Sequence, residues 1–372
     1  MDPFEIKTLP SSKAVVRGIQ GFILFSVTGT LLGWWWKRPA GLEALLSHLD
    51  WWFVALLFPL ICADYFLGGF RYRLFFDGKI LPHVSLWNCM RSNWANIFMG
   101  AATPFQTGGG PAQLYILWRC GAKISDGALI SLINFAATLI FFLVSTIAAA
   151  LLVSKDQFGE NFALILLTGF VVIGSIIGLV LLALIFPTVA LARLRQLLRL
   201  IPIQNAKFLA FRERLLATFA SETQHFCRAF AQILQHRKWS LAMVVVATLA
   251  LFFNKYLMGY VIARALGQSV PFRIFIGLQI IQLFLIYYAP TPGASGVAEL
   301  SSVWLMGKVM PTTMLLIYTV LWRFVTTLLG AVIGGFVLLL DIRFWTQRTL
   351  PGALTEAVPT FAHTTDAPNE NR

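Results

Sequence analysis

The sequence predicts an all-α polytopic integral membrane protein whose two halves repeat one structural unit in inverted orientation. Three observations indicate this fold class. Hydrophobic residues make up 58% of the 372-residue chain, charged residues make up 12%, and the mean hydropathy is +0.75. Several apolar runs are long enough to cross the roughly 30 Å of hydrocarbon in a bilayer. Similar Gly- and Pro-rich segments interrupt the apolar sequence at corresponding places in the two halves.

Six apolar runs are long enough to form transmembrane helices. In chain order they cover residues 19–36, 51–70, 127–153, 161–186, 239–262 and 311–340. The first run lacks the small-residue cleavage pattern of a signal peptide, so we expect it to be retained as a span. The expected membrane domain therefore covers 19–341. A polar segment, 1–18, precedes it, and a tail with the composition of a disordered segment, 342–372, follows it.

Basic residues are concentrated between the apolar runs, which predicts the orientation of the chain in an inner membrane. The segment 187–238 contains nine Lys or Arg residues and two Glu residues. The positive-inside rule places it in the cytoplasm, together with the N-terminus, the turn at 71–79 and the C-terminus, in agreement with six crossings. We attribute the net charge of +13 to basic segments that set the topology and contact anionic lipid. We expect no nucleic-acid partner.

Two segments, one in each half, align without a gap. They are TPFQTGGGPAQ at 103–113 and APTPGASGVAE at 289–299, which are 186 residues apart. Over 104–121 and 290–307, six of 18 aligned positions are identical, where background composition gives roughly one. The identical pairs are Pro104 and Pro290, Gly110 and Gly296, Ala112 and Ala298, Leu114 and Leu300, Trp118 and Trp304, and Gly121 and Gly307. Paired helix breaks of this kind are typical of transporter substrate sites.

Each motif region, 87–121 and 272–308, has two short apolar arms around the break, which predicts a re-entrant helical hairpin rather than a span. The flanking basic residues predict that the hairpins enter from opposite faces, the first from the cytoplasm. The surrounding spans match at the same offset, so the repeat units are about 51–153 and 237–339. Irregular backbone at membrane depth must be covered, so we expect the breaks to face each other. The alternative is a chance match between Gly- and Pro-containing helices.

The breaks supply candidate contacts for a phosphate group. Pro104, Pro290 and Pro292 interrupt the helices. The small residues after them can turn several backbone N–H groups toward one anion at the positive end of the next helix. The residues concerned are Thr107, Gly108, Gly109, Gly110, Gly293, Ser295 and Gly296. Close packing of the hairpins through small residues is the alternative explanation.

Polar side chains within the apolar regions are further candidates for substrate binding. Glu299 closes the second motif where Gln113 closes the first. We expect Glu299 to pair with Arg323 in the last span, either at a substrate site or as a structural pair. Lys255 lies inside the run 239–262 and is a further candidate. Side chains near the inner end of the second run are interpreted instead as interface anchors or headgroup contacts, namely Asp64, Arg71 and Arg73.

We expect no catalytic residue, metal site or cofactor. The four cysteines are scattered, and the five histidines show no ligand spacing. GASG at 293–296 matches the Gly-x-Ser-Gly of rhomboid-type proteases, but the span that follows contains no histidine to act as a base for Ser295. Because the sequence has no P-loop, uphill transport requires an ion gradient.

The motifs TPFQTGGGPAQLYILWRCG at 103–121, YYAPTPGASGVAELSSVWLMG at 287–307 and LWRF at 321–324 resemble the lysylphosphatidylglycerol synthase transmembrane-region family. The resemblance covers about residues 15–345 and implies lipid translocation or a related lipid-handling role. Full synthases carry a soluble aminoacyltransferase domain after the last span, whereas about 30 residues follow it here. Many relatives also have an acidic residue where this chain has Gln113.

We therefore expect a flippase-like lipid translocase that holds a phosphate-bearing headgroup between the hairpins while the apolar chains stay in the bilayer. The expected partners are an anionic or zwitterionic phospholipid or a polyprenyl phosphate, and a partner synthase that docks on 187–238. The alternatives are a membrane-embedded lipid-modifying transferase and an accessory or scaffold protein for a lipid or cell-envelope synthase.

Overall fold

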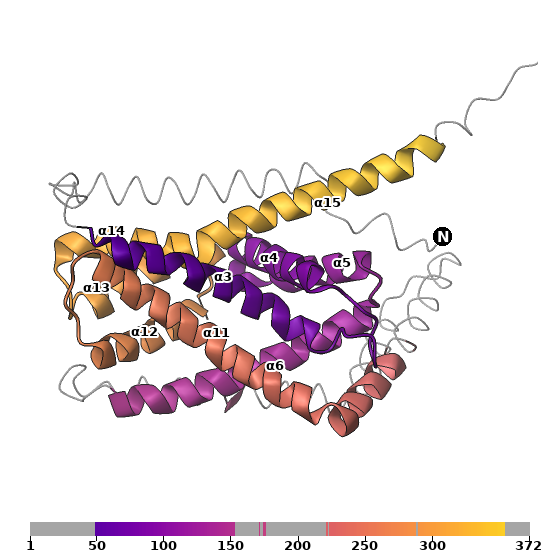
Figure 1. The fold of residues 1–372 in the computed structure, drawn as a ribbon, viewed down its shortest axis with the longest axis horizontal. Helices are drawn as coiled ribbons and strands as arrows, with labels where there is room; N and C mark the ends of the chain where they lie inside the picture. The colour runs from indigo at the N-terminus through magenta and orange to yellow at the C-terminus, as the bar shows by residue number, and fades with distance from the viewer. Residues whose placement is uncertain are drawn as a thin grey trace, which may run out of the picture.

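The computed structural model describes residues 49–152, 171, 174–175, 221, 223–287 and 289–353, with only the backbone of 150 and 343–353. Every regular element within these ranges is a helix, which confirms the expected all-α class. The helices form an elongated bundle and run roughly along its long axis (Figure 1).

The same order of elements occurs twice: a long helix, a short helix, a 3-10 turn, a second short helix and a further long helix. The first copy consists of α3 (Trp51–Arg73), α4 (Leu86–Ala102), η1 (Pro104–Gln106), α5 (Gly109–Arg119) and α6 (Ile124–Leu152). The second consists of α11 (Lys238–Ala265), α12 (Phe272–Tyr287), η2 (Pro292–Ala294), α13 (Val297–Met306), α14 (Thr312–Arg323), the π-helical η3 (Phe324–Leu328) and α15 (Leu329–Ala353).

Four helices of the described chain are long and apolar enough to cross a membrane. They are Trp51–Arg73, Ile124–Ala149, Lys238–Ala265 and Thr312–Ile342. Each coincides with one of the expected spans. The other two expected spans, 19–36 and 161–186, lie outside the described residues. The last helix continues to Ala353, past the expected end of the membrane domain at 341.

Contacts between helix ends show how the copies are oriented. At one end of the bundle, the Asp50 N–H donates to the Ala265 carbonyl oxygen at 3.0 Å. At the other end, Arg91 Nη2 lies 3.0 Å from Asp341 Oδ1. The hairpin α4–α5 has its base at this second end, and α12–α13 has its base at the first (Figure 1). The two hairpins therefore point in opposite directions, and their turns η1 and η2 contact each other between the two ends of the bundle.

Side-chain caps mark where two helices of the first copy, α3 and α4, begin. Asp50 Oδ1 accepts a hydrogen bond from the Trp52 N–H at 3.0 Å and caps α3. Ser85 Oγ accepts from the Asn88 N–H at 3.3 Å and caps α4. Such caps satisfy N–H groups that the first turn of a helix leaves without partners.

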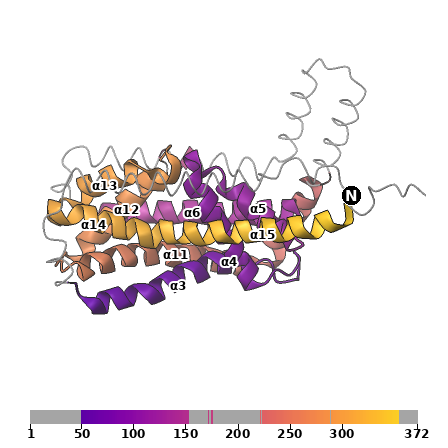
Figure 2. The same ribbon diagram turned by 90° about the horizontal axis from the view of Figure 1, so that it is seen from above.

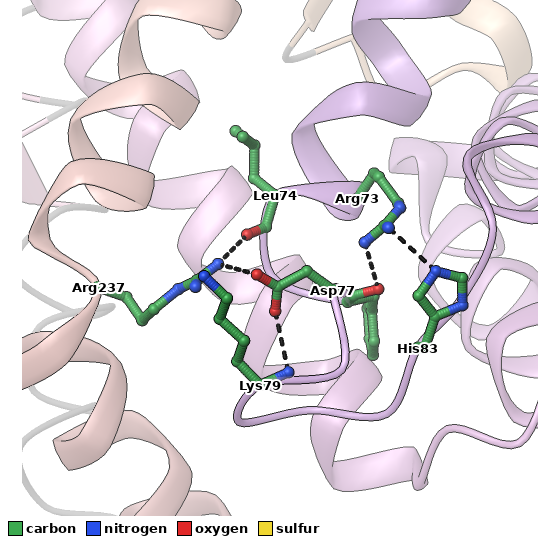
Figure 3. A network of polar contacts seen from close by, with 7 residues as sticks. Arg73, Leu74, Asp77, Lys79, His83 and Arg237 are labelled. Carbon is green, nitrogen blue, oxygen red and sulfur yellow. Dashed lines mark hydrogen bonds and ion pairs between the residues drawn. The ribbon is translucent and has the colours of Figure 1, made fainter.

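A polar network ties the α3–α4 loop to the start of α11 (Figure 3). Arg237 Nη2 donates to Asp77 Oδ2 at 2.6 Å and to the Leu74 carbonyl oxygen at 2.8 Å. The Lys79 N–H donates to Asp77 Oδ1 at 3.2 Å. Partial burial opposes ionisation of Asp77, but the hydrogen bonds from Lys79 and Arg237 outweigh it, and the pKa of the carboxyl is lowered. The loop is therefore held by an ionised carboxylate.

We expect Asp77→Asn to lower the free energy of unfolding at neutral pH by about 1 kcal/mol, because it removes a partly exposed ion pair. A carboxyl whose pKa is lowered by folding stabilises the fold at pH values above its pKa in the unfolded chain, which is about 4. This contribution is lost as the pH falls through the lower pKa of the folded state. The difference in melting temperature between wild type and variant should therefore shrink on acidification. Asp50→Asn, which keeps an acceptor for the Trp52 N–H, is the control. A difference that does not change with pH would contradict the role of the Asp77 carboxylate.

Candidate functional site

The candidate site lies where the turns η1 and η2 meet. Both turns contain consecutive residues in the left-handed region: Phe105 and Gln106 with φ of 51° and 57°, and Gly293 and Ala294 with φ of 57° each. Matching these conformations aligns Pro104 with Pro292 rather than with Pro290. The turns thus correspond at an offset of 188 residues, not at the 186 of the gap-free sequence match, because the connection between α12 and its turn is longer than that after α4.

The expected phosphate nest is partly occupied by hydrogen bonds within the first turn. The Thr107 N–H donates to the Pro104 carbonyl oxygen at 3.1 Å, and the Gly108 N–H donates to Thr103 Oγ1 at 2.8 Å. Gly109 and Gly110 begin α5, which no side chain caps. The anion-binding capacity of the first copy is therefore reduced to the start of this helix.

The second turn has a similar arrangement. The Ser295 N–H donates to the Pro292 carbonyl oxygen at 3.1 Å, and the Gly296 N–H donates to Glu299 Oε2 at 2.6 Å. Ser295, Gly296 and Glu299 are all exposed. Their binding of a ligand stays a prediction.

Arg323 is the buried cation beside this turn. It is 8% exposed, and within the described residues its guanidinium has neither a hydrogen bond nor an ion pair. A Cβ atom added to Gly293 would lie 3.7 Å from Arg323 Nη2, so the guanidinium lies next to η2. The residue ends α14 directly before the π-helix η3, a distortion that is frequent at functional sites. A buried charge without a partner is costly, so this position favours an anionic ligand.

Glu299 does not form the expected ion pair with Arg323. The carboxylate interacts with the guanidinium electrostatically, but the two groups are not within 4.0 Å. Glu299 instead accepts a hydrogen bond from the Gly296 N–H at the start of α13, which is one half of a capping box, since Gly296 has no side chain to supply the other half. The pairing was wrong because the carboxylate satisfies the N-terminus of its own helix.

Gln113 is the centre of a buried network in the first hairpin and is not equivalent to Glu299. Its Oε1 accepts from Tyr72 Oη at 2.8 Å and from Asn96 Nδ2 at 2.6 Å, while its Nε2 donates to Ser131 Oγ at 2.6 Å. The side chain therefore joins α5 to α3, α4 and α6.

The second hairpin has its own buried amide network. Gln282 Nε2 donates to Ser302 Oγ at 2.5 Å, and Gln279 Nε2 donates to Tyr318 Oη. Ser302 has the same part as Gln113, since each closes a bond from the first arm of its hairpin to the second. The two residues are not at the same register, because the offset of 188 residues pairs Gln113 with Ser301.

Lys255, Asp64 and Arg71 lie within the bundle. Lys255 Nζ is 2.9 Å from Asp64 Oδ1, and the Asp64 side chain is 5% exposed. Arg71 Nε donates to Asn134 Oδ1 at 2.7 Å. Asp64 and Arg71 are therefore not interface anchors. The sequence offered one signal for them, an ionisable residue within or beside an apolar run, but it did not show which face of α3 is buried.

We expect Gln113→Leu to lower the free energy of unfolding by about 2–3 kcal/mol, because it leaves the Asn96 amide and the Tyr72 hydroxyl buried without their partner. Tyr72→Phe, which leaves the Asn96 bond in place, should lower it by about 1 kcal/mol. Denaturant unfolding in detergent, followed by tryptophan fluorescence, measures both. Equal stability of wild type and Gln113→Leu would contradict the role of this network.

Comparison with known proteins agrees with this architecture. The chain is 24% identical over 308 residues to a UPF0104 membrane protein of Archaeoglobus fulgidus, covering 82% of this chain and 88% of the relative. Residues 21–334 match the family described as lysylphosphatidylglycerol synthase TM region. This match includes the first long–short–turn–short–long unit and the second as far as residue 334 in α15. The chain therefore belongs to the lysylphosphatidylglycerol synthase transmembrane-region family.

Proposed function

We propose that this protein is a lipid translocase that holds a phosphate-bearing headgroup beside Arg323, between the two turns. The observation that carries the proposal is the buried guanidinium, which has no hydrogen bond or ion pair among the described residues and lies next to η2. A phosphate supplies the charge and the acceptor oxygens that a guanidinium binds best. The start of α5, which no side chain caps, provides further N–H groups that favour an anion.

The arrangement of the hairpins supports transport rather than static binding. Because α4–α5 and α12–α13 point in opposite directions, a small movement of either one opens the site toward a different end of the bundle. Broken helices that meet between inverted repeats are the usual setting of transporter sites. We propose that the protein acts as a transporter and not as an enzyme.

Exposed apolar side chains near the turns give a place for the lipid tails. Phe105 on the first turn is 65% exposed, and Leu300 on α13 is 73% exposed. These surfaces can stay in contact with hydrocarbon while a headgroup enters between the turns. The family is named after lysylphosphatidylglycerol synthase, so phospholipids with anionic, zwitterionic or aminoacylated headgroups, and polyprenyl phosphates, are the substrates to test.

The proposed orientation places the base of the first hairpin in the cytoplasm. Arg73, Arg91, Arg119 and Arg237 lie at that end of the bundle, where each bonds with its neighbours in the loops and helix ends. A concentration of arginines at one end is typical of the cytoplasmic side of an inner membrane protein. Both termini would then be cytoplasmic.

We expect Arg323→Gln to slow the movement of fluorescent phospholipids across reconstituted liposomes by about 10- to 100-fold, as a lost charge-assisted hydrogen bond predicts. Arg323→Lys should retain part of the rate, because it keeps the charge without the planar fork. Arg264→Gln is the matched control, because Arg264 lies in the last turn of α11 and stacks over the Phe53 ring. Rates for Arg323→Gln and wild type that agree would remove Arg323 from the site.

We expect Gly293→Ala to impair transport for a different reason. The added Cβ would lie 3.1 Å from the Ala101 carbonyl oxygen, at a φ of 57° that is strained for alanine. It would also lie between η2 and Arg323 and restrict the approach of a ligand. Gly174→Ala, whose Cβ also meets nothing within 4 Å and which lies outside both hairpins, is the control. If both variants transport lipid equally well, close contact of η2 with α4 is not required.

A further inference from the structure

One carboxylate of the second copy holds both arms of the first hairpin. Asp341 on α15 has its Oδ1 3.0 Å from Arg91 Nη2 on α4 and its Oδ2 3.2 Å from Arg119 Nε on α5. The Asp341 side chain is 13% exposed, and the two arginine side chains are 24% and 26% exposed. Water and salt screen partly buried pairs less than exposed ones, so these two ion pairs tie the base of the hairpin to α15.

The same face of α15 continues this contact toward the turns. The helix runs beside α4 (Figures 1 and 2). Gly334 leaves no room for a Cβ atom against the Trp94 carbonyl oxygen, so the two helix backbones touch there. Asp341 follows Gly334 by seven residues, about two helical turns, and therefore projects from the same face. A shift of α15 away from α4 thus separates Asp341 from the hairpin.

The base of the second hairpin has a corresponding but weaker tie. Arg273 on its first arm, α12, donates by Nη2 to the Leu151 carbonyl oxygen at the end of α6, at 2.9 Å. The helices α6 and α14–α15 have the same place in the two copies, because each follows its hairpin. Arg273 is exposed, and this hydrogen bond is its one polar contact within the described residues. An exposed bond to an uncharged oxygen holds less firmly than a partly buried carboxylate shared by two arginines.

Asp341 lies on the same helix as the proposed anion site. The elements α14, η3 and α15 form one span, Thr312–Ile342. Arg323 directly precedes the π-helix η3, and Asp341 lies 18 residues further on, about 27 Å at 1.5 Å per residue. Helices bend where a π-helical turn interrupts the regular hydrogen bonds. The part of the helix that carries Asp341 can therefore shift relative to the part that carries Arg323.

We infer that Asp341 is a positioning residue that holds the first hairpin closed at the cytoplasmic end, an inference that rests on the proposed transport function. The site opens toward the cytoplasm only when α15 moves Asp341 away from Arg91 and Arg119. The second hairpin, held at its base by the exposed Arg273, opens toward the opposite face without this step. The two hairpins are thus unequal gates, and the state open to the cytoplasm is the rarer one.

A buried cysteine in each hairpin tests this inference. Ser92 on α4 and Ser302 on α13 are 0% exposed, and each is bonded to the other arm of its hairpin. Ser92→Cys and Ser302→Cys are made separately in full-length protein whose native cysteines are replaced. A membrane-impermeant maleimide is applied to vesicles of known orientation. Ser302→Cys should be labelled from the outer face faster than Ser92→Cys is labelled from the cytoplasmic face, and the reverse order would overturn the inference.

Asp341→Asn should raise the labelling rate of Ser92→Cys about tenfold, as the loss of two partly exposed ion pairs predicts, and leave that of Ser302→Cys unchanged. Asp341→Glu keeps the charge and should stay close to wild type. Asp77→Asn is the control, because it breaks an ion pair at the same end of the bundle that involves neither arm of the hairpin. An unchanged rate at Ser92→Cys, an equal rise at both cysteines or an equal rise with Asp77→Asn would each overturn the inference.

A second variant covers a failure of Asp341→Asn to fold. Arg119→Gln removes one of the two ion pairs and should raise the labelling rate of Ser92→Cys about threefold. No rise in this variant would also overturn the inference. Labelling does not require lipid to move, so a wild-type protein that moves no lipid contradicts the proposed function alone. Lipid transport by wild type, with labelling that does not respond to Asp341 or Arg119, contradicts this inference alone.

Discussion

The backbone groups released where the two hairpins break need hydrogen-bond partners, and this constraint determines how the turns η1 and η2 are built. In the first turn, Thr103 Oγ1 donates to the Met99 carbonyl oxygen and accepts from the Gly108 N–H. In the second, the Glu299 carboxylate accepts from the Gly296 N–H. The turns contact each other, but Pro104 to Thr107 of the first turn and Pro292, Ser295 and Gly296 of the second are exposed. The expectation that the breaks are covered is therefore wrong for the first turn, none of whose residues is buried.

The scaffold is repeated, but its chemistry is not. Arg71 and Arg323 are both buried. Arg71 donates hydrogen bonds to the side-chain oxygen and to the carbonyl oxygen of Asn134. Arg323 has no such partner among the described residues. The same contrast occurs where α3 meets α11, since Asp64 on α3 faces Lys255 on α11. Opposite charges attract across this contact, where like charges would repel. The two copies thus share a fold but not their buried charges.

Much of the fold could be predicted from the sequence, because spans and breaks follow from hydropathy and from Gly and Pro. The expected runs at 51–70 and 239–262 correspond to α3 and α11 within a few residues. The register at the turns could not be predicted, because it depends on the longer connection before Pro292. The burial of Asp64 was also hidden, since α3 is apolar on all sides and the sequence does not show which face meets α11. Glu299 was assigned to Arg323 because both are ionisable residues in apolar surroundings, whereas a helix N-terminus was the nearer partner.

The central claim is that the two hairpins open toward opposite faces of the membrane. Trp87 lies at the base of the first hairpin and Phe272 at the base of the second, and both are exposed. Single cysteines at these positions, in protein whose native Cys62, Cys89, Cys120 and Cys227 are replaced, can be labelled with a membrane-impermeant maleimide in vesicles of known orientation. The account predicts that Trp87→Cys reacts only from the cytoplasmic face and Phe272→Cys only from the other. Labelling of both from the same face would contradict it.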